Sequence, residues 1–131
     1  MADWSDCIAA TSALPGVEEA TTYGAAPALK VRGKIVCWYR DTPEALVVPV
    51  ADLAEKEALI AGSPEVYFTT DHYDGHAHVL VHLDRIPFAE LEELLEDAWR
   101  LRAGVRAVRA FDAERDDGDD GSSTEAGGTG A

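Results

Sequence analysis

"ALKVRGKIVCWYR", residues 28–40, is the stretch that decides the fold. It holds two short runs of apolar and polar residues, 28–33 and 34–40. β-branched and aromatic residues dominate both runs, which is typical of strands that bury one face. Gly33 and Lys34 stand between the runs and predict a tight turn. The sequence therefore predicts an antiparallel β-hairpin over these residues.

The rest of the chain supplies further strands and three helices. Apolar residues at helical spacing predict helices, and short apolar runs between turn residues predict strands. Asp52 is expected to cap the second helix, and Pro87 fits the first turn of the last one. Glu18 and Glu19 lead into residues 21–27, which are expected to form a turn-rich entry to the hairpin, and 41–43 are expected to form another turn. The predicted helices cover 3–13, 53–61 and 88–102, and the further strands cover 45–50, 65–70 and 78–83.

This pattern predicts the order α-β-β-β-α-β-β-α, which is typical of an α+β fold. The expected architecture is an antiparallel sheet of about five strands with the helices on one face. The other face of such a sheet can stay open to water. Chain length predicts one domain, over residues 1–111. Residues 112–131 are charge-rich and then rich in Gly and Ser, so we expect a disordered tail.

The charge balance is acidic, with 25 Asp and Glu against 11 Lys and Arg, for a net charge of −14. From Asp112 onward there are seven acids and one arginine. Such a field argues against non-specific binding to nucleic acid. Two cysteines, no signal peptide and no long apolar run indicate a cytoplasmic protein with reduced thiols and no membrane contact. We also expect a monomer without a cofactor.

All four histidines fall in "FTTDHYDGHAHVLVHL", residues 68–83, together with Asp71 and Asp74. On a regular strand His78, Leu80 and His82 share one face, and the alternate residues 79, 81 and 83 share the better core face. A metal site would need three or four ligands that converge from more than one segment. The favoured interpretation is a solvated strand face with no metal, beside a turn shaped by His72, Tyr73 and Asp74. The alternative is a metal bound by His76 and His78, which can lie side by side.

The hairpin also carries a basic series. Lys30, Arg32 and Lys34 alternate along it, and Trp38 and Arg40 follow at even spacing. Basic strands that carry an aromatic residue can contact phosphates and stack bases. The alternative is that these charges only solvate the strand and discourage edge pairing. A second basic set at Arg100, Arg102, Arg106 and Arg109 can bind an anion or the acidic tail, in particular Asp116, Asp117, Asp119 and Asp120.

Catalytic machinery is not expected. The chain has no GxSxG motif, and Cys37 lies in the middle of a predicted strand. Glu90, Glu92, Glu93 and Glu96 are expected on a helix surface, where they do not form an acid/base pair.

The order of elements and several stretches resemble the MmcQ/YjbR family. The stretches are 13–39, 64–84 and 91–103, and the most specific is G-x-x-P-x-x-K-V-x-G-K, residues 24–34. The resemblance implies a fold similar to frataxin and CyaY, and DNA binding by a double wing of hairpins. It brings no catalytic residues. His76, His78 and the acidic tail depart from the usual pattern of the family.

We therefore expect a small non-enzymatic binding protein that contacts DNA through the basic hairpin. The alternative is a module that binds a protein or small ligand on the open sheet face, around Trp38, His78, Leu80 and His82. DNA binding would then be absent because of the acidic charge. Metal binding of the frataxin type is less favoured, since the acids lie on the last helix and not on the first.

Overall fold

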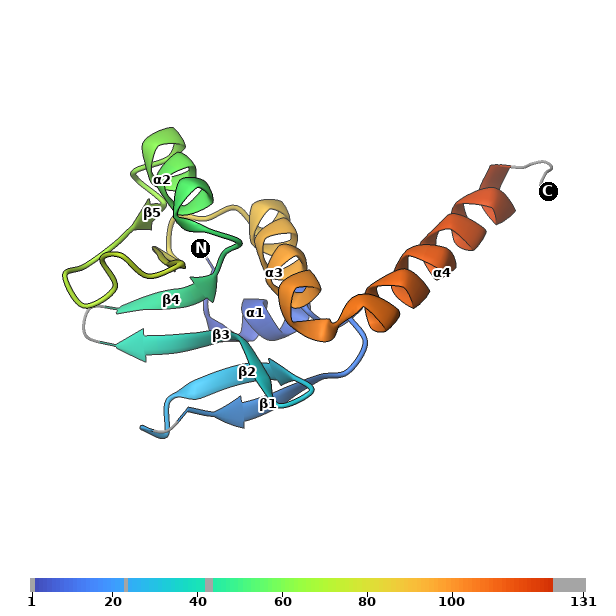
Figure 1. The fold of residues 1–131 in the computed structure, drawn as a ribbon, viewed down its shortest axis with the longest axis horizontal. Coiled ribbons are helices and arrows are strands. Elements are labelled where there is room, and N and C mark those ends of the chain that lie inside the picture. Colours follow the sequence, from blue (N-terminus) through green and yellow to red (C-terminus); the bar gives the residue numbers. More distant parts are fainter. Residues whose placement is uncertain (1, 23, 42–43, 124–131) are drawn as a thin grey trace.

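Ten elements build the protein around a single sheet (Figure 1). The computed structural model describes residues 2–22, 24–41 and 44–123, with side chains as far as residue 115. The helices are α1 (Trp4–Ala10), α2 (Leu53–Gly62), α3 (Phe88–Ala103) and α4 (Val105–Ser123). The strands are β1 (Val17–Thr21), β2 (Pro27–Val31), β3 (Lys34–Asp41), β4 (Glu44–Pro49), β5 (Tyr67–Phe68) and β6 (His78–Val81).

The α+β class is confirmed, with six strands in the described residues where about five were predicted. Their order in the sheet is β1-β2-β3-β4-β6-β5, and every neighbouring pair is antiparallel. The added strand, β1, covers residues to which no element was assigned and ends at Thr21, where the turn-rich stretch was predicted to begin. Its register runs from Val17 opposite Val31 to Thr21 opposite Pro27. Its mostly exposed residues give little apolar alternation, so its pairing with β2 is what makes it a strand.

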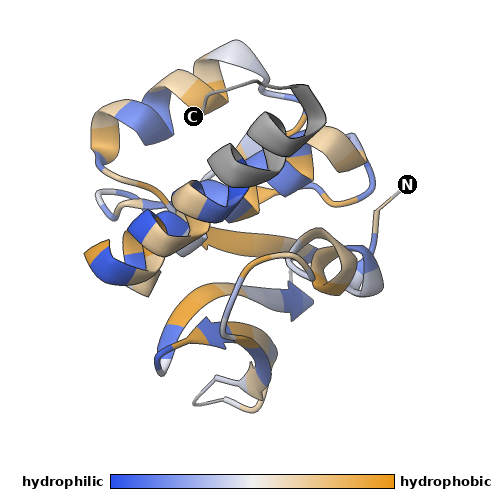
Figure 2. Ribbon diagram, turned by 90° about the vertical axis from the view of Figure 1, so that its right-hand side faces the viewer, coloured by the Kyte–Doolittle hydropathy of each residue, from blue (hydrophilic) through white to orange (hydrophobic). Residues whose placement is uncertain are grey.

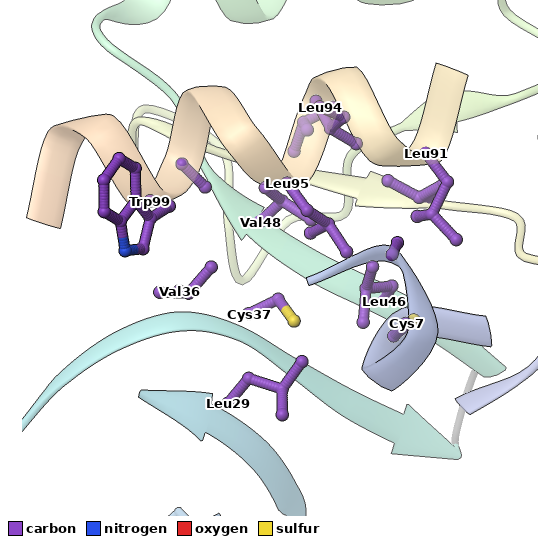
Figure 3. Close-up of a cluster of buried hydrophobic side chains, with 14 of the residues drawn as sticks. Cys7, Leu29, Val36, Cys37, Leu46, Val48, Leu91, Leu94, Leu95 and Trp99 are labelled. Atoms are coloured by element: carbon purple, nitrogen blue, oxygen red, sulfur yellow. The ribbon is translucent and has the colours of Figure 1, made fainter. Parts of the chain in front are cut away.

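The main core lies between one face of the sheet and helices α1 and α3. Leu91, Leu95 and Trp99 of α3 are fully buried, and the Trp99 indole donates a hydrogen bond to the Pro15 carbonyl at 2.9 Å. Figure 3 shows these side chains directed toward the strands and toward Cys7 of α1. Burial of each such large side chain stabilises the fold by about 1.5–3 kcal/mol. The strand residues opposite them are Leu29, Val36, Cys37, Leu46 and Val48.

The start of α2 follows the predicted capping, whereas Pro87 stands at the N-cap of α3 and not in its first turn. The Asp52 carboxylate accepts a hydrogen bond from the Glu55 backbone N–H at 2.8 Å, as expected for an N-cap. Asp3 and Asp6 form a reciprocal capping box at the start of α1. Figure 2 shows orange along much of the strands and mixed colours along the helices, in agreement with a sheet buried by amphipathic helices.

The hairpin turn lies one residue earlier than predicted. Val31 pairs with Lys34, so Arg32 and Gly33 are the two turn residues, with φ of 56° and 76°. Positive φ at both positions is the geometry of two-residue hairpins that match strand twist. The turn predicted at 41–43 falls mostly outside the described residues.

The second face of the sheet is not open, which corrects the prediction. Ala45, Val47 and Leu80 are fully buried there. Trp38, Phe68 and Tyr73 pack over them and form a small second core. Tyr73 belongs to the loop between β5 and β6, and this loop is held by Lys56 of α2. The Lys56 ammonium donates to the carbonyl oxygens of Tyr73 at 2.6 Å and His76 at 2.9 Å.

The chain does not become irregular at residue 112. Helix α4 continues to Ser123, whereas disorder was predicted from 112; residues 124–131 lie outside the described part. Its first half is bound to α3. Arg100 donates to both carboxylate oxygens of Asp112, at 2.7 and 3.1 Å, and Arg115 pairs with Glu96 at 3.0 Å. These contacts offset part of the conformational entropy that is lost when the segment becomes ordered, a loss that the composition of the segment by itself does not offset.

Candidate functional site

A β-bulge in β3 determines which of its residues face the candidate site. Leu29 pairs with Cys37, but Lys30 pairs with Ile35, so Val36 is an extra residue in β3. Such a bulge bends a strand and interrupts its alternation. Val36 and Cys37 are both fully buried in the main core, although they are adjacent. Ile35 and Trp38 on either side of them are left on the second face.

The sheet also opens at this point. β3 pairs with β4 only from Trp38 to Asp41, so its first four residues have no partner in β4. The far end of β4, at Val48 and Pro49, pairs with β6 alone. Arg102, from the end of α3, reaches this part of β3 and donates from Nε to the Ile35 carbonyl at 3.2 Å. A cation from the helix layer is thereby brought to the second face.

The resulting pocket has a volume of about 490 Å³ and is lined by Lys34, Ile35, Trp38, His78 and Arg102. No lining residue is acidic, although the chain carries a net charge of −14. Lys34 is exposed, while Arg102 and Trp38 are half-buried. The pocket is therefore lined by two permanently charged side chains, Lys34 and Arg102, together with the aromatic ring of Trp38 and the apolar side chain of Ile35.

The Trp38 ring is held by its neighbours. The His78 ring stands edge-on to the Trp38 indole, with 5.5 Å between ring centroids, and the Tyr73 ring lies 6.3 Å from the same indole. Arg40 lies over the Tyr73 ring at 5.5 Å, within the range of a cation–π contact. The indole therefore has a defined orientation before any ligand arrives.

Burial lowers the pKa of His78 below its ordinary value of 6.5, and Arg102, His76 and Lys56 lower it further by repulsion. The imidazole is thus neutral at pH 7 and offers one hydrogen-bond donor and one acceptor. An anion in the pocket would oppose this repulsion and favour the imidazolium.

Only some of the predicted nucleic-acid residues meet here. Lys34 and Trp38 line the pocket, but Lys30, Arg32 and Arg40 do not. Arg32 donates to the Ala103 carbonyl at 3.0 Å and so caps the carboxyl end of α3. Lys30 lies opposite Glu18 of β1 in the strand register and is not among the residues that line the pocket. Arg102 was assigned to a separate basic set, because the sequence does not reveal that α3 ends beside the hairpin.

The histidine-rich stretch separates into distinct parts. Only His78 lines the pocket; His82 stacks on Phe68, with 4.2 Å between ring centroids. His72 and Tyr73 are in edge-on contact in the turn that also holds Asp74. Among the described residues no group of three or more His, Cys, Asp or Glu side chains is placed to hold a metal ion. The same residues include no helix long and apolar enough to cross a membrane.

Both thiols lie in the main core and away from the pocket. Burial raises the pKa of Cys7 to about 12, and burial raises the pKa of Cys37 well above its ordinary value. Neither cysteine forms a disulfide. Protonated, buried thiols are poor nucleophiles.

Comparisons with known proteins place the chain in a family. Residues 12–101 match the family model YjbR. Uncharacterized proteins from Mycobacterium tuberculosis and Mycobacterium bovis are 36% identical over 128 residues, which cover 85% of this chain and 96% of theirs. A crystal structure of the Deinococcus radiodurans protein DR2400, described by its DUF419 domain, has the same fold. It matches with a TM-score of 0.64 and 23% identity, over 77% of this chain and 78% of that chain. The resemblance seen in the sequence is confirmed, and the chain belongs to the YjbR family.

Proposed function

We propose that this protein is a non-enzymatic binding module that contacts nucleic acid at the pocket of Lys34, Trp38 and Arg102. One observation carries the proposal: two cations and an aromatic ring converge in a pocket without a lining acid, on an otherwise acidic chain. Phosphate contacts position a nucleic acid, and aromatic faces stack its bases. Neither requires a catalytic group. The predicted cytoplasmic location and monomeric state stay predictions.

The net charge limits the affinity. At low ionic strength the acidic body repels a polyanion over a long range, and salt screens that repulsion together with the local attraction. Each phosphate contact with a single strand contributes about −0.7 to the slope of log affinity against log salt. Two cations therefore predict a shallow slope, between about −1 and −2. The interaction we expect is weak and local.

The first test is charge reversal at Lys34. Lys34→Glu should weaken binding of a labelled oligonucleotide at low salt by at least about tenfold, since one charge-assisted contact is worth about 1.5 kcal/mol. The measurement is fluorescence anisotropy across a salt series. Lys34 is exposed, so the fold should survive, and circular dichroism and the melting temperature check this.

The matched control is Arg85→Glu. Arg85 is exposed beyond β6 and contacts the Glu65 carbonyl, away from the residues that line the pocket. It changes the net charge by the same amount. Equal losses in both variants would show that only the net charge matters, and no binding by the unaltered protein at low salt would reject the proposal.

A small organic anion is the second candidate ligand, in place of a nucleic acid. The observation that favours it is the covered second face: Tyr73 and Trp38 pack over Leu80 and Val47, and Trp38 also lines the pocket. Its volume lies in the range of small-ligand sites, about 300–1,000 Å³. A panel of nucleotides and carboxylates, followed by chemical-shift mapping, separates this candidate from the first.

A further inference from the structure

We infer that the pocket accepts one unpaired nucleotide, with its phosphate between Lys34 and Arg102 and its base on Trp38. The protein would then prefer single strands to duplexes. This inference rests on the proposed function and specifies the form of nucleic acid that the site accepts. It comes from how Trp38 is placed and from how few cations accompany it.

Trp38 lines the pocket. It is half-buried, with Tyr73 and His78 against it, and it stands beyond the bulge that turns Val36 and Cys37 into the core. A flat group on a ligand in this pocket can stack on the indole. A base in a duplex is already stacked on both faces, and freeing it costs a few kcal/mol. An unpaired base meets no such cost.

The cations are arranged for a short contact. Lys34 and Arg102 line the same pocket, and within the described part of the chain no hydrogen bond or ion pair engages the Lys34 ammonium or the Arg102 Nη atoms. Two such groups suit one or two phosphates. A duplex held by its backbone alone would need more contacts along the groove. The other hairpin arginines are committed elsewhere, Arg32 to the carboxyl end of α3 and Arg40 to the Tyr73 ring.

The dimensions and the remaining lining residue agree with a nucleotide. About 490 Å³ falls within the volume range of small-ligand sites, and Ile35 adds an apolar side chain to the lining. His78 presents a neutral imidazole at the edge of the indole, where it can exchange a hydrogen bond with the edge of a stacked base. An unpaired base leaves that edge accessible, whereas a paired base does not.

The experiment compares three ligands of one length at low salt by anisotropy. They are a single-stranded oligodeoxynucleotide, its duplex, and an abasic strand that keeps the phosphates. The single strand should bind about five- to a hundredfold more tightly than either of the others, the range expected for stacking of one base. Trp38→Ala should remove most of this preference, and Trp38→Phe, which keeps a smaller ring for stacking, should reduce it. Trp4→Phe is the matched control, because Trp4 is half-buried against Tyr39 and does not line the pocket.

The outcomes separate the two proposals. Absence of binding by all three ligands rejects the proposed function itself. If the duplex or the abasic strand binds as tightly as the single strand, phosphate binding is retained, but the assignment of the base to Trp38 is overturned. A mononucleotide bound as tightly as the strand would agree with a base on Trp38 but would overturn the preference for a nucleic-acid strand, because the site would then take a free nucleotide. Trp38→Phe retains an apolar ring under Tyr73, so a folded variant is available if the alanine variant fails to fold.

Discussion

At the scale of single residues, His78 links the pocket to pH. In the free protein its pKa is lowered by burial and by Arg102, His76 and Lys56, so the imidazole is neutral near pH 7. A bound phosphate adds a negative charge beside it and raises that pKa. The residue therefore binds a proton more readily in the complex than in the free protein.

Affinity for an anion should accordingly rise as the pH falls from the His78 pKa of the complex toward that of the free protein. The gain is about tenfold for each unit by which the two pKa values differ. Binding measured by anisotropy from neutral to mildly acidic pH tests this. His78→Gln should abolish the pH dependence and His72→Gln, on an exposed turn residue, should retain it. A pH profile unchanged by His78→Gln would contradict the assignment.

At the scale of elements, the hairpin and α3 are joined by two reciprocal hydrogen bonds. Arg32 of the turn donates to the Ala103 carbonyl, and Arg102 of α3 donates to the Ile35 carbonyl. Gly104 makes room for the first contact. A Cβ on Gly104 would stand 2.2 Å from the Arg32 Nη1 atom, and its φ of 95° also disfavours other residues. This junction positions Arg102 at the pocket.

Arg32→Ala should lower the free energy of unfolding by about 1 kcal/mol, because the Ala103 carbonyl loses its charged donor. Alanine carries the same backbone cost as arginine at a φ of 56°, so the change reports the guanidinium alone. Urea unfolding measures the loss. Arg106→Ala, on an exposed position of α4, is the control and should change stability little. If Arg32→Ala and Arg106→Ala are equally stable, Arg32 does not stabilise the junction between the hairpin and α3.

At the scale of the whole molecule, a local basic pocket sits on a strongly acidic chain. Residues 116–131 carry five acids and no Lys or Arg. The first turns of α4 are different, because Asp112 and Arg115 are ion-paired with α3. The tail hypothesis can therefore be tested without disturbing these contacts, by ending the chain after residue 115.

Removal of residues 116–131 should strengthen binding of the single strand a few-fold at low salt, and the gain should shrink as salt is added. The physical reason is the loss of five repelling carboxylates. Anisotropy titrations of both chains at two salt concentrations make the comparison. A neutral replacement of the same length, with the five acids changed to Asn and Gln, separates charge from length. An affinity that stays the same in both shortened and neutralised chains would show that the tail has no part in binding.

Much of the fold was predictable because local patterns decide it. The β-branched and aromatic runs in 28–40 and the capping by Asp52 predicted elements that the structure contains, and the alternate faces of 78–83 placed Val79 and Val81 in the main core. Predictions failed where contacts between residues far apart in the sequence decide the local structure. β1 has a weak pattern of its own, and α4 gains its first turns from ion pairs with α3. The covered second face depends on a loop that Lys56 holds from another helix.

The sequence by itself determined the α+β class, the family and the presence of cations and Trp38 on the hairpin, since strand period and residue type are local properties. Only the tertiary structure decided which of those cations act together. A one-residue bulge at Val36, the opening between β3 and β4, and the end of α3 bring Lys34, Trp38, His78 and Arg102 to one pocket. Residues 34 and 102 line one pocket because packing, and not sequence spacing, sets the distances between elements.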